Sequence, residues 1–354
     1  MGNNKMMLDP NPPVGHARTA WVWSSKSLRN LAICLLVYVI IAALVAPAPF
    51  VSFISHYVSA ISFFMPILIL PICLVGWFAM RRWHDPKVIG GHLFGRLPLI
   101  AILAFALLLV FTAYTTFKFK IPDIVPFYAD AWAAGLDSSL HNGDPWRWTH
   151  AVWPEAWSNV IILFYNYLWF FYWFATPMFV ILWLKPGMVK QYLWAMFLTF
   201  VICGTILAIV FSSVGPIFYA DMLGSDRFAD LSNQLDTLQG MDTVTVYAAY
   251  LFQSYEGKNA VFGTGISAIP SMHVAVVVLN AWLFSSLNRW AGLAAWGFAA
   301  MIMFGSVYTG WHYAVDGYLS FIAVSCIWVA VRKAHGHVFS FPAFQLPKLS
   351  PQDL

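Results

Sequence analysis

The sequence predicts an all-α fold, a polytopic membrane helix bundle with about eight transmembrane helices, and three observations predict it. Hydrophobic residues make up 60% of the 354 residues and charged residues only 10%, whereas a soluble domain carries roughly 25% charged residues. Eight apolar stretches approach or exceed the length of about 20 residues that crosses a bilayer as a helix. Basic residues also recur at every second connection between these stretches.

The eight apolar stretches follow one another along the chain. Their approximate bounds are residues 28–45, 59–80, 97–117, 159–184, 192–212, 272–287, 291–308 and 313–331. The last three are short and depend on tight connections. The first is followed by Ala46, Pro47 and Ala48, which also suit a signal-peptide cleavage site, but its long leader favours an uncleaved anchor.

The basic residues orient the predicted bundle in its membrane. They lie before the first span and at every second connection after it, at Arg18, Lys26, Arg29, Arg81, Arg82, Lys87, Arg96, Lys185, Lys190, Arg289, Arg332 and Lys333. Because basic connections remain in the cytoplasm, we expect both termini there and the long loops 118–158 and 213–271 outside. We expect a multi-pass protein of a bacterial inner membrane with a periplasm-facing site; a lumenal Golgi-type site obeys the same physics.

The first segment with candidate chemistry runs from Gly263 to His273, at the outer start of the sixth span. Gly263 and Gly265 let the backbone turn, and Pro270 suits the first turn of a helix. Unpaired N–H groups at a helix start bind anions, and His273 can reach an anion bound there. An ordinary helix start with a hydrogen-bonded histidine explains the same residues.

The second such segment runs from Tyr308 to Asp316, at the outer start of the last span. His312 and Asp316 are four residues apart, which predicts that they share one face of a helix. A carboxylate there can hold one ring nitrogen as N–H and leave the other as a nucleophile or base. The alternative is a buried His–Asp pair that only ties the helix in place.

The predicted topology brings both segments to the same side of the membrane. Two histidines and an aspartate beside an anion site suit phosphoryl transfer, in which one histidine attacks phosphorus and the other protonates the departing oxygen. No cluster of Asp, His or Cys has metal-ligand spacing, so neither a metal nor a cofactor is expected.

These residues resemble the signature motifs of a known family. Pro-Ser-Met-His at 270–273 and His-Tyr-Ala-Val-Asp at 312–316 resemble the second and third motifs of the type 2 phosphatidic acid phosphatase superfamily. Over residues 128–331 the chain resembles the branch of fungal inositol phosphorylceramide synthase, an inositolphosphotransferase. Segment 131–148 resembles the amphipathic outer segment of that branch, and 213–219 stands in the place of the first motif.

The resemblance implies a division of the chain and a role for each motif residue. A six-helix catalytic domain would occupy 121–333, preceded by a cytoplasmic leader at 1–27 and N-terminal transmembrane helices at 28–120 and followed by a cytoplasmic tail at 334–354. His312 would be the nucleophile that forms a phosphohistidine, with Asp316 as its orienting partner. His273 would be the acid and then the base, and Ser271 would hold phosphate oxygens.

Two departures from the superfamily pattern bear on phosphate binding. Ser306 stands where the third motif has an arginine, six residues before His312. Segment 213–219 has neither the lysine nor the arginine that the first motif supplies. The inositol phosphorylceramide synthase branch shares both absences, so the resemblance favours that branch and leaves the phosphate without its usual cations.

The missing cation is therefore sought in the outer loops. Arg147, Arg227 and Lys258 are the candidates for phosphate binding. Arg147, between two tryptophans, is the preferred candidate for the phosphate-binding cation. An interfacial arginine beside the tryptophans of an aromatic belt explains the same sequence at least as well. Lys118 and Lys120 are interpreted as interfacial anchors.

The residues and the resemblance together predict a metal-independent membrane enzyme. It would move the headgroup phosphate of a phospholipid donor to a lipid alcohol acceptor of the ceramide or diacylglycerol type. The alternative is a phosphatase that hydrolyses a lipid phosphomonoester or pyrophosphate at the outer face. A transporter is disfavoured because the chain has no internal repeat and no ionisable residues near mid-membrane. Nucleic acid is not an expected partner.

Overall fold

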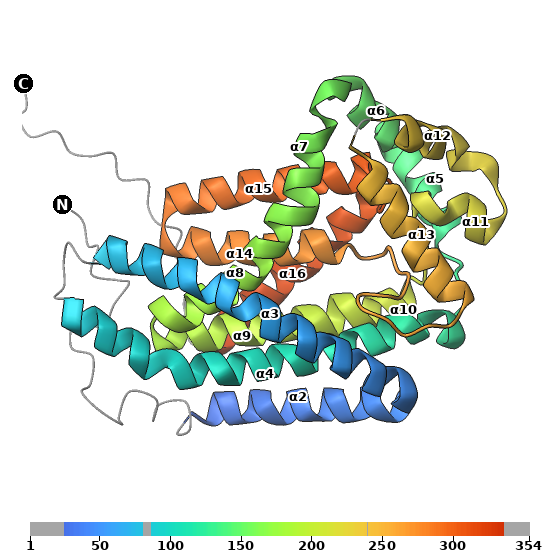
Figure 1. Ribbon diagram of the computed structural model, residues 1–354. Helices are drawn as coiled ribbons and strands as arrows, with labels where there is room; N and C mark the ends of the chain where they lie inside the picture. The colour runs from blue at the N-terminus through green and yellow to red at the C-terminus, as the bar shows by residue number, and fades with distance from the viewer. Residues whose placement is uncertain (1–24, 81–85, 239, 336–354) are drawn as a thin grey trace, which may run out of the picture.

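The computed structural model describes residues 25–80, 86–238 and 240–335, and within them it is helical with no strand (Figure 1). The predicted all-α membrane bundle is therefore confirmed. Most of the predicted leader, Arg18, Arg81, Arg82 and the tail from residue 336 lie outside the described residues.

Each of the eight predicted spans is found as a helix. They are α2 (Lys26–Val45), α3 (Pro47–Met80), α4 (Pro86–Ile124), α7 and α8 (Ser158–Ile162 and Trp169–Trp183), α9 and α10 (Pro186–Val201 and Ala208–Val210), α14 (Met272–Leu287), α15 (Arg289–Tyr308) and α16 (Ala314–Ala334). Two π-helical segments, η3 (Leu163–Leu168) and η4 (Ile202–Leu207), join α7 to α8 and α9 to α10.

Seven of these helical stretches are long and apolar enough to cross a membrane, so the chain is an integral multi-pass protein. The exception is α14, whose 16 residues extend only about 24 Å against a hydrocarbon core of about 30 Å. Residues 46–58 were expected to form the connection between the first two spans, and that expectation was wrong. Helix α3 begins at Pro47, because proline is preorganised for a first helical turn.

The long connections are also helical and gather at one end of the bundle (Figure 1). The first holds α5 (Asp130–His141) and α6 (Pro145–Val152), and the second holds α11 (Tyr219–Leu223), α12 (Ala229–Thr237) and α13 (Asp242–Glu256). At the other end, the Ser27 hydroxyl lies 3.2 Å from His335 Nε2. The start of α2 and the end of α16 therefore adjoin.

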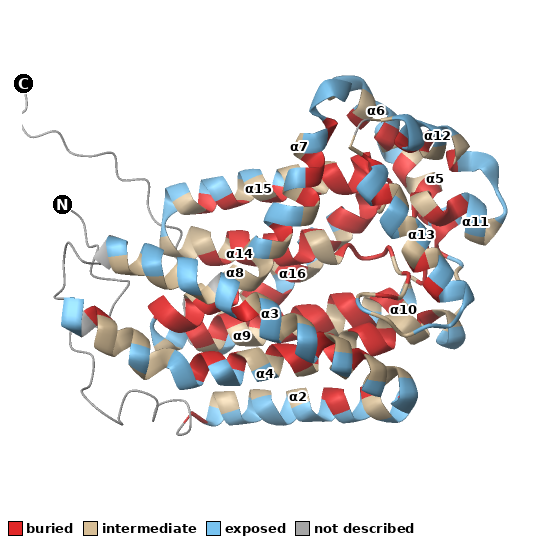
Figure 2. Ribbon diagram, in the orientation of Figure 1, coloured by how far each residue is buried: buried red, intermediate tan, exposed pale blue. Residues whose placement is uncertain are grey.

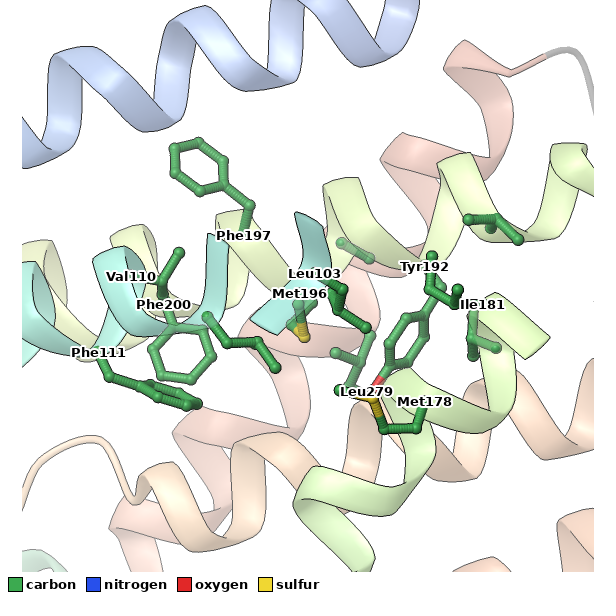
Figure 3. Packing of buried hydrophobic residues seen from close by; sticks show 14 of the residues in the cluster. Leu103, Val110, Phe111, Met178, Ile181, Tyr192, Met196, Phe197, Phe200 and Leu279 are labelled. Carbon is green, nitrogen blue, oxygen red and sulfur yellow. The ribbon is translucent and has the colours of Figure 1, made fainter. Parts of the chain in front are cut away.

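Helices α4, α8, α9 and α14 enclose the main core (Figure 3). Phe200, Met178 and Val189 are fully buried there. By contrast, exposed positions on the outward faces of α2 and α3 carry large apolar side chains, including Ile33, Leu36 and Leu70 (Figure 2). Helices with such outward faces suit a lipid surrounding, where every backbone hydrogen bond is made within the helix.

Candidate active site

His312 lies in the turn between α15 and α16, with 6% of its surface exposed. Its Nδ1 is 2.9 Å from the carbonyl oxygen of Ala268. Because a carbonyl oxygen only accepts hydrogen bonds, Nδ1 carries the proton and Nε2 of the neutral ring keeps its lone pair. Burial also lowers the pKa of His312 to about 3, so the ring is neutral at physiological pH. His312 is thus held as a nucleophile or base at Nε2.

Asp316 is fully buried and holds the same turn from the other side. Its Oδ2 accepts from the backbone N–H of Tyr313 at 3.0 Å and lies 3.3 Å from Nδ1 of His312. The pair was expected on one helical face, which is wrong, because α16 begins only at Ala314. The two side chains meet across the helix start, where the Asp316 carboxylate accepts from the backbone N–H of the N-cap residue, Tyr313.

His273 occupies the first turn of α14 and faces His312, with 6.1 Å between the ring centroids. Its ring stacks on Tyr165 with centroids 4.4 Å apart and packs on Trp169 with centroids 4.0 Å apart. Tyr165 belongs to the π-helical segment η3, and such wider turns often mark functional sites. The two histidines are close enough to act on one phosphoryl group.

Ser271 is the N-cap of α14, and its hydroxyl accepts from the backbone N–H of Val274 at 3.4 Å. Its carbonyl accepts from the Ser320 hydroxyl on α16 at 2.9 Å. Ser271 therefore joins α14 to α16 and aligns the starts of both helices. Pro270 was expected in the first helical turn. That expectation was wrong, because Pro270 precedes the N-cap residue Ser271.

Two aspartates of α5 hold the backbone around His312, a role that was not predicted for either of them. Asp137 accepts from the backbone N–H groups of Ala314 at 2.7 Å and Val315 at 2.9 Å. The exposed N–H groups that make a helix start an anion site are therefore already occupied at α16. Burial raises the pKa of Asp137, and these two hydrogen bonds lower it, because they favour the carboxylate.

The second of these aspartates is Asp130, which is 1% exposed. It accepts from the backbone N–H groups of Val214 and Gly215 and from the Tyr313 hydroxyl, the last at 2.9 Å. Burial raises the pKa of Asp130, and these hydrogen bonds oppose that effect because they favour the carboxylate. One carboxylate thus joins α5, the segment 213–219 and the residue next to His312.

Comparison with known protein families gives one match. The sequence model of the PAP2 superfamily matches residues 131–331, more than half of the 354 residues. The chain belongs to the PAP2 superfamily. Searches of curated proteins and of solved structures gave no match. The superfamily expected from the two histidine motifs is confirmed, and its members are phosphatases or phosphotransferases that act on lipid phosphates.

The place of the first PAP2 motif, residues 213–219, contributes through its backbone. Ser213 accepts at its hydroxyl from the backbone N–H of Ile269 and at its carbonyl from that of Ala268. Gly215 has φ +92°, and an added Cβ would lie 2.6 Å from the carbonyl oxygen of Trp311. Only glycine fits this approach. The segment therefore supports the carbonyl that binds His312.

Ser306, at the place of the superfamily arginine, is also fully buried. Its hydroxyl donates to the carbonyl of Met303 at 2.8 Å, and its own carbonyl accepts from the backbone N–H of His312 at 3.2 Å. Ser306 thus shapes the turn that carries His312, and its neutral hydroxyl supplies no positive charge there.

The three cations proposed for the PAP2 phosphate lie in other surroundings. Arg147, half-exposed, pairs with Asp230 at 2.7 Å, and its guanidinium lies over the Trp146 ring. Arg227 donates to the Ala134 carbonyl, the Ser138 hydroxyl and Asp144. Lys258 is exposed in the turn after α13. Both arginines tie the outer helices together, and within the described residues none of the three contacts the histidine pair.

Proposed function

We propose that the chain is a metal-independent lipid phosphotransferase that moves the headgroup phosphate of a phospholipid to a lipid alcohol through a phosphohistidine. The observation that carries the proposal is the fixed tautomer of His312. Its Nδ1 is committed to Ala268, so its Nε2 lone pair is available beside His273. A neutral imidazole held this way is a competent nucleophile for phosphorus.

In the first step, Nε2 of His312 forms a bond to phosphorus as the bond from phosphorus to the diacylglycerol oxygen breaks. His273 gives its proton to that oxygen, which leaves as an alcohol. The positive charge that develops on the His312 ring is balanced by the Asp316 carboxylate, 3.3 Å from Nδ1. The headgroup phosphate is then held on His312.

In the second step, His273 takes the proton of the acceptor hydroxyl, and the acceptor oxygen bonds to phosphorus as the bond to Nε2 breaks. The products are the new phosphodiester and the original enzyme. His273 thus acts first as acid and then as base, which requires no net proton exchange with bulk water.

Burial favours an alcohol over water as the acceptor. His312 is 6% exposed, and α5 covers the turn through Asp130 and Asp137. Exclusion of water is what distinguishes a transferase from a hydrolase with the same intermediate. Two further features favour the inositol phosphorylceramide synthase branch. Ser306 stands where the superfamily motif has an arginine, and segment 213–219 has no basic residue.

The proposal places the site on the periplasmic side of a bacterial inner membrane, with both termini in the cytoplasm. Lys87, Lys185 and Arg289 lie at the starts of α4, α9 and α15. These helix starts lie at the end of the bundle away from α5, α6, α11, α12 and α13 (Figure 1). At the site end, Trp132, Trp148 and Trp157 are each more than half exposed. Exposed tryptophans of this kind sit at lipid headgroup level, where lipid substrates would enter.

The function is tested with the purified full chain and a phospholipid labelled in its headgroup phosphate, with and without ceramide or diacylglycerol. We expect label to move to the added lipid alcohol, at a rate that depends on acceptor concentration. Release of water-soluble labelled headgroup or phosphate at the same rate without acceptor would instead establish a hydrolase. His312→Ala serves as the inactive control.

A further inference from the structure

A transferred phosphate needs a cation, and one lysine lies near enough to the histidine pair to interact electrostatically with both rings. Lys118 is half-buried near the end of α4 that faces the site. It lies outside the region matched to the PAP2 superfamily, which begins at residue 131. The lysine therefore comes from the N-terminal helices, before the segment that carries the histidines.

Close packing brings Lys118 against the loop that leads to His273. Gly265 has φ +100°, and an added Cβ would lie 3.0 Å from the carbonyl carbon of Lys118, 3.1 Å from its Cγ and 2.9 Å from the backbone nitrogen of Phe119. Only glycine allows this approach at that backbone conformation. The loop that leads to the helix start at Ser271 thus rests directly on α4.

Charge placement also distinguishes Lys118 from the other lysines of this region. Its ammonium interacts electrostatically with both His273 and His312. It forms no ion pair or hydrogen bond within the described residues, whereas Lys120, two residues later, pairs with Asp123. A half-buried ammonium is costly without an anion, and no carboxylate of the described part of the chain pairs with it.

We propose that Lys118 is the phosphate-binding cation of this site and contacts the non-bridging phosphate oxygens of the substrate between His273 and His312. The inference rests on the proposed function and deepens it. The ammonium supplies the charge that Ser306 and segment 213–219 lack, and it lowers the energy of the transferring phosphoryl group. The N-terminal helices therefore complete the catalytic site and are more than an anchor.

The test measures binding of orthovanadate to the purified full chain, which does not depend on turnover. We compare Lys118→Met, which keeps length and removes charge, with Lys118→Arg and with Lys120→Met as the matched control. We expect Lys118→Met to weaken binding roughly 10- to 100-fold, the worth of one hydrogen bond to a charged group. Lys118→Arg should retain most of the affinity, and Lys120→Met should bind like the wild type.

Unchanged vanadate affinity in Lys118→Met would overturn the proposal. If that variant fails to fold, the wild-type protein is acetylated with an amine-reactive reagent with and without vanadate. Vanadate should then protect Lys118 and leave Lys120 unprotected, and equal labelling of Lys118 in both samples would also overturn it. Absence of any phosphate transfer by a wild type that binds vanadate would reject the proposed function and leave Lys118 as an anion-binding residue.

Discussion

The Nδ1–H of His312 donates to the carbonyl oxygen of Ala268 at 2.9 Å, and this contact leaves Nε2 as the nitrogen that would attack phosphorus in the proposed mechanism. Ala268 is itself held by the carbonyl of Ser213, so the acceptor is part of a rigid backbone junction. Asp316 lies farther from Nδ1, at 3.3 Å. The backbone therefore sets the tautomer, and in the proposed mechanism the carboxylate would balance the charge that develops on the ring.

Replacement of the two histidines should separate the nucleophile from the acid. We expect His312→Ala to lose all measurable transfer, because the proposed intermediate forms on Nε2 of this residue. His273→Ala should lower kcat by about 10²- to 10⁴-fold, the usual worth of general acid–base catalysis. Headgroup transfer in detergent measures both, and His56→Ala on α3 serves as a histidine control outside the site. Transfer at the wild-type rate by His312→Ala would contradict the mechanism.

Asp316→Asn should reduce the rate without abolishing it. The Ala268 carbonyl still holds the proton on Nδ1, so the correct tautomer survives, and only stabilisation of the imidazolium is lost. We expect kcat to fall roughly 10- to 100-fold, as for one hydrogen bond to a charged group. Complete loss of activity in a variant that remains folded would show that Asp316, and not Ala268, sets the tautomer.

Asp137→Asn should destabilise the turn around His312. The amide places an N–H donor against one of the two backbone N–H groups of α16, so one buried donor loses its acceptor. The expected loss is about 1–3 kcal/mol of unfolding free energy, measured as a lower apparent Tm in detergent. Asp236→Asn, an exposed position on α12, is the matched control and should leave Tm unchanged.

The depressed pKa of His312 predicts how stability changes with pH. The folded pKa is about 3, below the ordinary value of about 6.5. Between these values the unfolded chain binds more protons, so stability is full above pH 6.5 and falls as pH falls toward 3. The slope from this group is at most about 1.4 kcal/mol per pH unit. Apparent Tm of the wild type should therefore fall more steeply than that of His312→Gln from pH 7 to pH 5, and equal slopes would contradict the prediction.

The membrane helices could be predicted because hydropathy and charge act locally. Helix α14 was predicted with its bounds, Met272–Leu287, and α2 and α15 begin only two residues before the predicted starts. The early start of α3 at Pro47 was missed, because a segment with small residues and prolines resembles a loop. Local pattern thus located the spans better than the connections.

The catalytic roles of the two histidines and Asp316 stay a prediction, but their proximity was also predicted, because both motifs stand at span starts on one side of the membrane. Their supports were not, since those contacts join residues far apart in the chain. Asp137 meets α16 across 177 positions, and Asp130 meets Tyr313 across 183. No local pattern distinguishes such a carboxylate from one on an exposed amphipathic helix.

The surroundings of the basic residues also depend on contacts between residues far apart in the chain. Arg147 stood out in sequence beside its tryptophans, yet its partner Asp230 lies 83 positions away and takes up its charge. Lys118 resembled an interfacial anchor at the end of a span, and only the packing of Gly265 against α4 brings it to the site. Pairing of charges depends on the fold, and composition alone does not reveal it.

The most direct test of the mechanism is to trap the covalent intermediate. The purified chain is mixed with labelled phospholipid in the absence of acceptor, quenched in alkali, where phosphohistidine persists, and mapped by mass spectrometry. The mechanism predicts one labelled residue, His312, with label that is lost when lipid alcohol is added before the quench. Label on another residue, or product formation with no labelled residue at any time, would contradict it.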